Sequence, residues 1–223
     1  MIRLTPWLLA LLPGPVLGHA ISETNARFVE AINGPAVVPF AYLGAKHMVT
    51  GYDHLLFLVG VVFFLYRLKD VVLYVTMFTV GHSLTLLLGV LTQTTVSAYL
   101  VDGIIGLSIV YKAFENLGGF ERVIKLRIDT RVAVFVFGLA HGLGLATKVL
   151  ELTVSDNGLV INILSFNVGV EIGQVLALIV VVVLLNQWRN HTAFAQHAVT
   201  ANTLLMAGGF VLAGYQFAGH WLG

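Results

Sequence analysis

Six long apolar runs follow one another from about residue 39, and the short segments between them hold most of the charged residues. Each run approaches or exceeds the roughly 20 residues that a helix needs to cross a bilayer. The runs predict helices near 39–66, 71–91, 95–114, 131–150, 159–186 and 201–221. The first and fifth are long, and Gly51 and Gly169 are the positions where they are expected to break or tilt. The expected fold is an all-α integral membrane protein, a bundle of about six transmembrane helices.

The first 20 residues have the pattern of a secretory signal peptide. Arg3 precedes a short apolar core, residues 4–12, and Pro13-Gly14-Pro15 then interrupts the helix before a run of small residues. The core is shorter than a membrane span, which favours cleavage over the alternative of an uncleaved first helix. Residues 1–20 are therefore expected to be removed. Residues 21–38 then form a short extracytoplasmic segment, and residues 39–223 form the six-helix transmembrane domain.

Composition supports a membrane protein and excludes several kinds of site. Of the 223 residues, 58% are hydrophobic and 10% are charged, with a mean hydropathy of +0.91. Soluble domains carry roughly 25% charged residues, so this chain lacks a typical soluble surface. The net charge of +1 gives no electrostatic argument for a nucleic-acid partner. The absence of cysteine excludes disulfides, thiolate metal sites and a cysteine nucleophile.

The basic residues predict the orientation of the bundle, because Lys and Arg gather on the cytoplasmic side of membrane proteins. With the mature N-terminus outside, the connecting segments on the cytoplasmic side hold eight basic residues and those on the outer side hold three. The eight are Arg67, Lys69, Lys112, Arg122, Lys125, Arg127, Arg131 and Arg189, and the three are Arg27, Lys46 and Lys148. Six helices with both mature ends outside the cytoplasm satisfy this asymmetry.

The densest polar motif is His47-x5-Asp53-His54, at the mouth of an apolar segment. Ionisable groups are costly there and indicate a functional site. A spacing of seven residues places both rings on one helix face with Cα atoms about 10 Å apart. Either Gly51 breaks the helix and brings them together, or the histidines belong to successive sites along a path. Asp53 is expected to bind a metal or to orient an imidazole; the alternative is a helix cap beside histidines in the headgroup region.

Further polar residues lie inside the later apolar runs, at depths that match the first motif. The expected metal ligands are His47, Asp53, His54, His82, His141 and Glu171, supported by Ser83, Asp102, Asn167 and Gln174. Gly138 with Gly142, and Gly169 with Gly173, have the small-xxx-small spacing that lets helices pack closely. The alternative is that a neighbouring helix satisfies each polar group separately. Glu115 and Asn116 are expected at the inner interface, and His19, His191, His197 and His220 carry less weight.

Five stretches of the chain resemble the HupE/UreJ family of bacterial membrane proteins. They begin at His47, Phe78, Leu107, Phe137 and Phe166, and they include Gly51-x-Asp53-His54, Gly81-His82-Ser83, Glu115-Asn116, Ala140-His141-Gly142 and Asn167-x3-Glu171. The resemblance implies a signal peptide, about six helices in the bacterial inner membrane and a role as a nickel or cobalt permease. Some members of the family accompany hydrogenase or urease. The first motif also resembles the His-x4-Asp-His signature of nickel/cobalt permeases, with one more residue in its spacing.

The predicted function is a divalent metal permease and not an enzyme, with Ni²⁺ as the first substrate and Co²⁺ as the next. Imidazole and carboxylate leave copper, zinc and iron open. No Gly-x4-Gly-Lys motif is present, so this chain is not expected to hydrolyse ATP. The alternatives are a metal-binding accessory or assembly subunit of a membrane complex, and an intramembrane metalloenzyme. The expected partners are the lipid bilayer and the metal ion, without nucleic acid; the sequence leaves open a homo-oligomer or a larger membrane complex.

Overall fold

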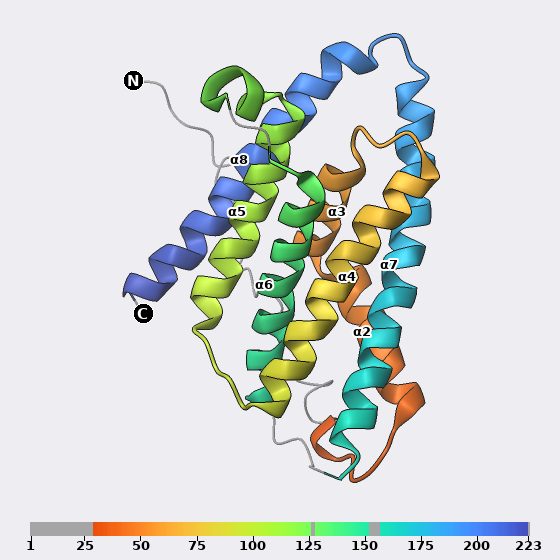
Figure 1. The fold of residues 1–223 in the computed structure, drawn as a ribbon, viewed down its shortest axis with the longest axis vertical. Helices are drawn as coiled ribbons and strands as arrows, with labels where there is room; N and C mark the ends of the chain where they lie inside the picture. The colour runs from red at the N-terminus through yellow and green to blue at the C-terminus, as the bar shows by residue number, and fades with distance from the viewer. Residues whose placement is uncertain (1–28, 126–127, 152–156, 223) are drawn as a thin grey trace, which may run out of the picture.

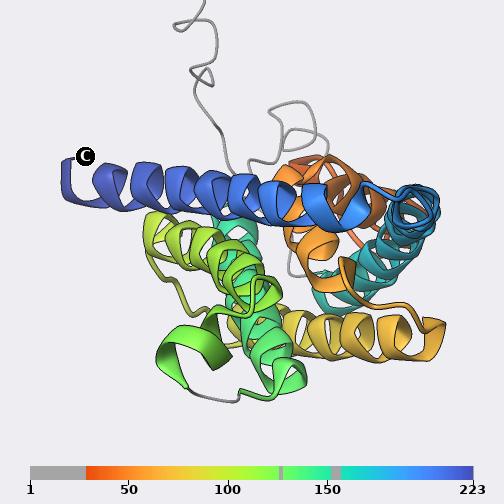
Figure 2. The ribbon, with the colours of Figure 1, turned by 90° about the horizontal axis from the view of Figure 1, so that it is seen from above.

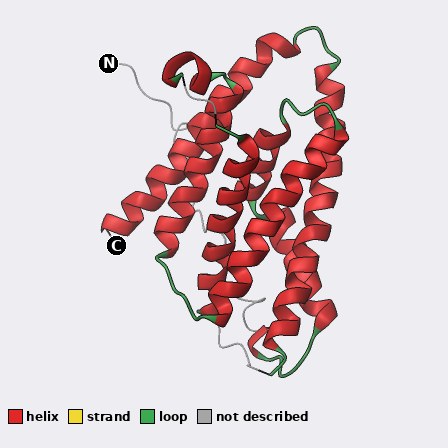
Figure 3. Cartoon of the chain, viewed as in Figure 1, coloured by secondary structure: helices red, strands yellow, loops and turns green. Residues whose placement is uncertain are grey.

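The computed structural model describes residues 29–125, 128–151 and 157–222, and these ranges contain helices and no strand (Figure 3). The helices are α2 (Val37–Thr50), α3 (Tyr52–Val62), α4 (Leu68–Leu91), α5 (Ala98–Asn116), the π-helical turn η2 (Phe120–Ile124), α6 (Thr130–Leu150), α7 (Leu159–Arg189) and α8 (Phe194–Leu222). The expected signal peptide and the beginning of the expected extracytoplasmic segment lie outside the described residues. His19 and Arg27 lie outside them as well.

The break expected at Gly51 is confirmed, because the run expected over 39–66 forms two helices, α2 and α3, that meet there. Gly51 has extended backbone angles, φ −73° and ψ 97°. Its N–H still donates to the carbonyl of His47 at 2.9 Å, and its carbonyl accepts the N–H of Leu55 at 3.1 Å. A Cβ at this position would lie 2.9 Å from Nδ1 of His54, so the close approach of that ring requires glycine. By contrast, α7 is continuous through Gly169.

Four helices, α4, α6, α7 and α8, are long and apolar enough to cross a membrane, and α3 is a shorter apolar helix. Their outward faces are apolar as well as their buried faces. On α7, for example, Leu176 is 55% exposed and Val180 is 58% exposed. A helix that is apolar all round suits a lipid environment. The described part of the chain is therefore an all-helical protein with the surface of a membrane protein.

The helices pack as three close pairs: α4 with α6, α2 with α7, and α5 with α8 (Figures 1 and 2). Figure 2 shows α8 lying along one side of the bundle, across α5. Glycines set the close approach in each pair. A Cβ at Gly173 would lie 2.6 Å from the carbonyl oxygen of Ala45, and one at Gly106 would lie 2.6 Å from the amide nitrogen of Ala213. Helix backbones can approach this closely only where no side chain intervenes.

The connections gather basic residues at one end of the bundle, here called the basic end. Segments 63–67 and 117–125 lie at this end, and segment 92–97 lies at the opposite end (Figure 1). Segment 92–97 contains no Lys or Arg, and the sequence of residues 151–158 contains none either. Four lysines expected in connecting segments instead lie inside helices: Lys46 in α2, Lys69 in α4, Lys112 in α5 and Lys148 in α6. Lys112 and Lys148 are each paired with a carboxylate.

Near the basic end, a polar cluster joins α3, α5, α6 and α8. Lys112 contacts Glu115 at 2.7 Å, and Thr130 donates to the other oxygen of Glu115. The amide of Asn116 donates to the carbonyl of Gly60 at 2.8 Å and to the side chain of Asn202 at 2.9 Å. Glu115 and Asn116 therefore hold helices together instead of facing the solvent at an interface.

Two charged side chains cap helices at the same end. The guanidinium of Arg189 donates to the carbonyls of Val62, Phe63 and Leu65, which satisfies groups that the end of α3 leaves open. Asp129 accepts the N–H of Arg131 at 2.9 Å at the start of α6. Hydrogen bonds from the side chain and backbone of Arg131 hold the pKa of Asp129 below its usual value.

Candidate metal centre

His54 lies at the centre of four imidazoles that come from four different helices. Its ring centroid is 5.1 Å from that of His47 on α2, 4.9 Å from that of His141 on α6 and 6.3 Å from that of His82 on α4. His54 is 2% exposed, while His82 and His141 are fully buried. The break at Gly51 makes this possible, because it lets both histidines of the first motif approach the same place. We call these four residues the histidine cluster.

Asp53 adjoins the histidine cluster and orients its central ring. One carboxylate oxygen lies 3.1 Å from Nδ1 of His54 and accepts the backbone N–H of the same residue at 2.9 Å. The carboxylate is almost entirely buried. Where His54 donates Nδ1–H to this oxygen, its lone pair lies at Nε2, and the ring is held in one orientation. This is the arrangement that proteins use to prepare an imidazole for binding a metal.

Three phenylalanines frame the histidine cluster. Phe78 stacks on His82 with centroids 6.1 Å apart and meets the edge of His141 at 4.9 Å. Phe57 lies 5.6 Å from His141, and Phe166 lies 5.9 Å from His47. The frame therefore gives the imidazoles apolar walls.

The rings are close enough for a shared ion, but their nitrogens do not converge. Two imidazoles bound to one ion at about 2.1 Å have centroids roughly 5 Å apart, close to the distances from His54 to His47 and His141. Edge-to-face stacking, however, directs ring edges at neighbouring rings. Within the described ranges, no group of three or more His, Asp or Glu side chains is arranged to hold a metal ion. Binding an ion requires the rings to turn without moving apart.

The structure does not bring Glu171 to the histidine cluster. Glu171 is exposed on α7 and lines a groove of about 520 Å³ between α4 and α7, together with Thr76 and Thr79. Gln174 also lines this groove and accepts a hydrogen bond from Thr79 at 2.7 Å. Asn167, expected to support the site, accepts a hydrogen bond from Ser83 at 3.2 Å. These three polar residues of α7 therefore contact or face α4, and Gln174 also lines a small cavity together with His54.

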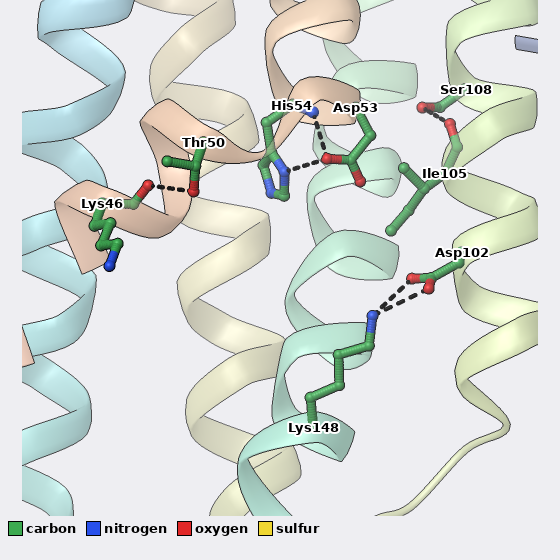
Figure 4. A network of polar contacts seen from close by, with 8 residues as sticks. All are labelled: Lys46, Thr50, Asp53, His54, Asp102, Ile105, Ser108 and Lys148. Carbon is green, nitrogen blue, oxygen red and sulfur yellow. Dashed lines mark hydrogen bonds and ion pairs between the residues drawn. The ribbon is translucent and has the colours of Figure 1, made fainter. Parts of the chain in front are cut away.

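Asp102 lies on the side of Asp53 that faces away from the cluster. Its carboxylate pairs with the ammonium of Lys148 at 3.0 Å, and both side chains are nearly buried (Figure 4). Asp53 and Asp102 line the same cavity of about 10 Å³, with Tyr52 and Gln216. This ion pair joins α5 to α6 between Asp53 and the end of the bundle that carries segment 92–97 (Figure 4).

The glycines expected to pack helices contact backbone atoms of their neighbours. A Cβ at Gly142 would collide with the carbonyl oxygen of His82, and one at Gly138 with that of Phe78. A Cβ at Gly169 would likewise collide with the carbonyl oxygen of Ala41. The Gly142 contact also holds the backbone of His82 beside the residue that follows His141. Close packing and the position of two imidazoles thus depend on the same glycine.

Sequence reasoning missed the aromatic frame and the partner of Asp102. Phe57 is three residues after His54 and Phe78 is four residues before His82, spacings that place each on the same helix face as its histidine. That signal was available. Lys148 is seven residues after His141 and shares its face of α6 in the same way. Gln216 had no comparable signal, because nothing in the sequence indicates that α8 crosses α5 at this height.

A protein-family model described as HupE / UreJ protein matches residues 23–222, which is nearly the whole chain. No curated protein and no solved structure matches it.

Proposed function

The chain belongs to the HupE/UreJ family, and we propose that it is a permease for a divalent transition metal, with Ni²⁺ as the first substrate and Co²⁺ as the next. One observation carries this proposal: the break at Gly51 brings His47 and His54 together and places them beside His82 and His141. Neutral imidazole is a ligand for Ni²⁺, Cu²⁺, Zn²⁺ and Fe²⁺. Copper, zinc and iron therefore remain competitors in any test.

The broken helix favours transport over catalysis. Transporters often place their substrate where a membrane helix is interrupted, because the interruption supplies polar groups and freedom to move. A catalytic metal needs a fixed set of ligands with one open position. Here the imidazoles come from four separate helices, and the rings must turn to reach an ion. We therefore propose a site that takes up and releases the metal, in a protein that is not an enzyme.

We propose six membrane spans in the bacterial inner membrane. α2 and α3 together form the first span, and α4, α5, α6, α7 and α8 form the others. The basic end faces the cytoplasm, because connecting segments rich in Lys and Arg stay on that side. After cleavage of the signal peptide over residues 1–20, both mature ends lie outside the cytoplasm. Metal then enters from the end that carries segment 92–97.

The proposed orientation predicts the behaviour of reporter fusions. A reporter inserted after Arg122, or fused after a truncation at Asn190, should be active only as a cytoplasmic reporter. A reporter fused after Gly223 should be active only outside the cytoplasm. The asymmetry of Arg and Lys between the two ends of the bundle is the physical reason. Cytoplasmic activity of the Gly223 fusion would require an odd number of spans and would contradict the proposal.

Uptake of Ni²⁺ by liposomes that contain only the purified protein tests the function directly. A permease should accumulate the ion without a second protein, whereas an accessory or assembly subunit should not. Uptake should fall as the outer pH is lowered, because protons compete with the metal ion for the imidazole nitrogens. Bound Ni²⁺ without uptake would favour the accessory subunit. Uptake that does not change with pH would argue against imidazole ligands.

A further inference from the structure

We infer that Asp53, Asp102 and Gln216 form a second divalent-cation site of oxygen ligands, outside the histidine cluster, and that the ammonium of Lys148 is its built-in competitor. The inference rests on the proposed function, since it adds a binding site that the transported ion would reach before the histidine cluster. It concerns a different set of donors: two carboxylates and an amide, with one carboxylate also oriented toward His54 (Figure 4).

The first support is the cavity that these side chains share. It has a volume of about 10 Å³, close to the space that one water molecule needs. Asp53 and Asp102 reach it from α3 and α5, and Gln216 reaches it from α8. A bare divalent cation fits a space of this size. Carboxylate and amide oxygens are the ligands that Mn²⁺, Mg²⁺ and Ca²⁺ prefer.

The second support is Gln216, a buried polar side chain on α8. It is 7% exposed, and no hydrogen bond joins its amide to any other residue in the described part of the chain. Polar side chains in residues this deeply buried usually have a hydrogen-bond partner. Its place in the wall of the cavity gives the amide oxygen a use, because that oxygen can bind a cation between the two carboxylates.

The third support is that a cation already lies against one of these carboxylates. The ammonium of Lys148 is 3.0 Å from one oxygen of Asp102 and 3.3 Å from the other. The side chains of the pair are 11% and 9% exposed, so little solvent screens their attraction. Lys148 approaches from α6, whereas the cavity is lined by α3, α5 and α8. A divalent cation that enters the cavity therefore competes with the single positive charge of Lys148 for the carboxylate of Asp102.

This arrangement gives Asp53 two neighbours of different chemistry. One oxygen orients the imidazole of His54, and its carboxylate also lines the oxygen site. A cation held by Asp53 and Asp102 is thus one residue away from the histidine cluster. Transfer from oxygen to nitrogen ligands favours Ni²⁺ and Co²⁺ over Mg²⁺ and Ca²⁺, because imidazole binds the last two poorly. The oxygen site admits divalent cations broadly, and the histidine cluster selects among them.

The test uses Mn²⁺ as the probe and thermal unfolding of the purified full-length protein as the measurement. Lys148→Met removes the ammonium and keeps the length of the side chain. It should lower the melting temperature without metal, since Asp102 loses its partner. Mn²⁺ should then bind at least about tenfold more tightly than to the wild type and raise the melting temperature by about 5 °C. Lys148→Arg, which keeps the charge, should respond to Mn²⁺ as the wild type does.

Two further variants locate the effect. Asp102→Asn combined with Lys148→Met removes both charges of the ion pair, and this double variant should lose the Mn²⁺ response. Gln216→Leu combined with Lys148→Met should lose most of the response. An equal Mn²⁺ response in Lys148→Met and in the Asp102→Asn double variant would overturn the inference. So would a Lys148→Met protein that does not respond, or that does not fold even in Mn²⁺. If the wild type does not take up Ni²⁺ but the variants respond to Mn²⁺ as expected, the proposed permease function would be overturned and the proposed oxygen site would be supported.

Discussion

Replacing His54 by alanine is expected to abolish Ni²⁺ uptake while the helical bundle stays folded. His54 is the ring that the other three imidazoles approach, and Asp53 orients it. Removing a residue that only orients a ligand weakens metal binding about 10–100-fold, so loss of the central ligand should exceed about 100-fold. Uptake into liposomes and binding of Ni²⁺ to the purified variant measure the two effects separately. His220→Ala is the matched control, because His220 is exposed near the end of α8 and should leave uptake unchanged.

A double variant distinguishes one shared site from separate sites. If His54 and His82 bind the same ion, combining His54→Ala with His82→Ala should weaken binding little beyond His54→Ala alone, because the coordination shell is already broken. If neighbouring helices satisfy each ring separately, the two losses should add. Additive losses, or wild-type uptake by His54→Ala, would refute the shared site.

Replacing Gly169 by alanine is expected to destabilise the bundle although alanine is the better helix former. The added Cβ would collide with the carbonyl oxygen of Ala41, which is backbone and cannot swing away. Overpacking of this kind destabilises by about 1–3 kcal/mol and exceeds the gain in helix propensity of about 1 kcal/mol. Thermal unfolding of the purified variant in detergent should show a melting temperature several degrees below that of the wild type.

Gly214→Ala provides the control for that change, because an added Cβ there has no neighbour within 4 Å. Alanine should leave the melting temperature of this variant unchanged or slightly higher, as helix propensity alone predicts. Both substitutions add one methyl group to a long apolar helix, so their difference isolates the contact between α2 and α7. Equal melting temperatures for the two variants would show that the close approach at Gly169 contributes nothing to stability.

The pattern of apolar runs predicted the helices and named Gly51 as a possible break in the first run. Four of the six expected helices lie within a few residues of their expected bounds, because long apolar runs have few alternatives to a helix, whereas α8 begins seven residues before the expected position 201. From the sequence alone, Gly51 and Gly169 were equally plausible positions for a break or tilt in a helix. Gly51 interrupts its helix and lets the ring of His54 approach to 2.9 Å from where a Cβ would lie, whereas α7 continues through Gly169, which packs against the backbone of Ala41.

The candidate site was predictable in part for a similar reason. A histidine inside an apolar run has few uses, so His47, His54, His82 and His141 were recognisable before their geometry was known. Glu171 looked equivalent in sequence, but the side of a helix that faces lipid or a groove depends on its rotation within the bundle. The sequence of α7 does not determine that rotation, because the helix is apolar all round. The partners of Asp102 depend likewise on how α5, α6 and α8 cross.

The pairing of the helices distributes the four imidazoles over separate rigid bodies. His82 and His141 belong to one body, because α4 and α6 are locked by glycine contacts along their length. His47 moves with α7, to which α2 is locked in the same way, and His54 sits on α3, which packs mainly against α5. A rotation of α4 and α6 together against α3 would therefore change the distances from His54 to His82 and to His141 and keep the His82–His141 distance. In the proposed permease, such a movement would change the spacing of the proposed ligands without unwinding a single turn of helix.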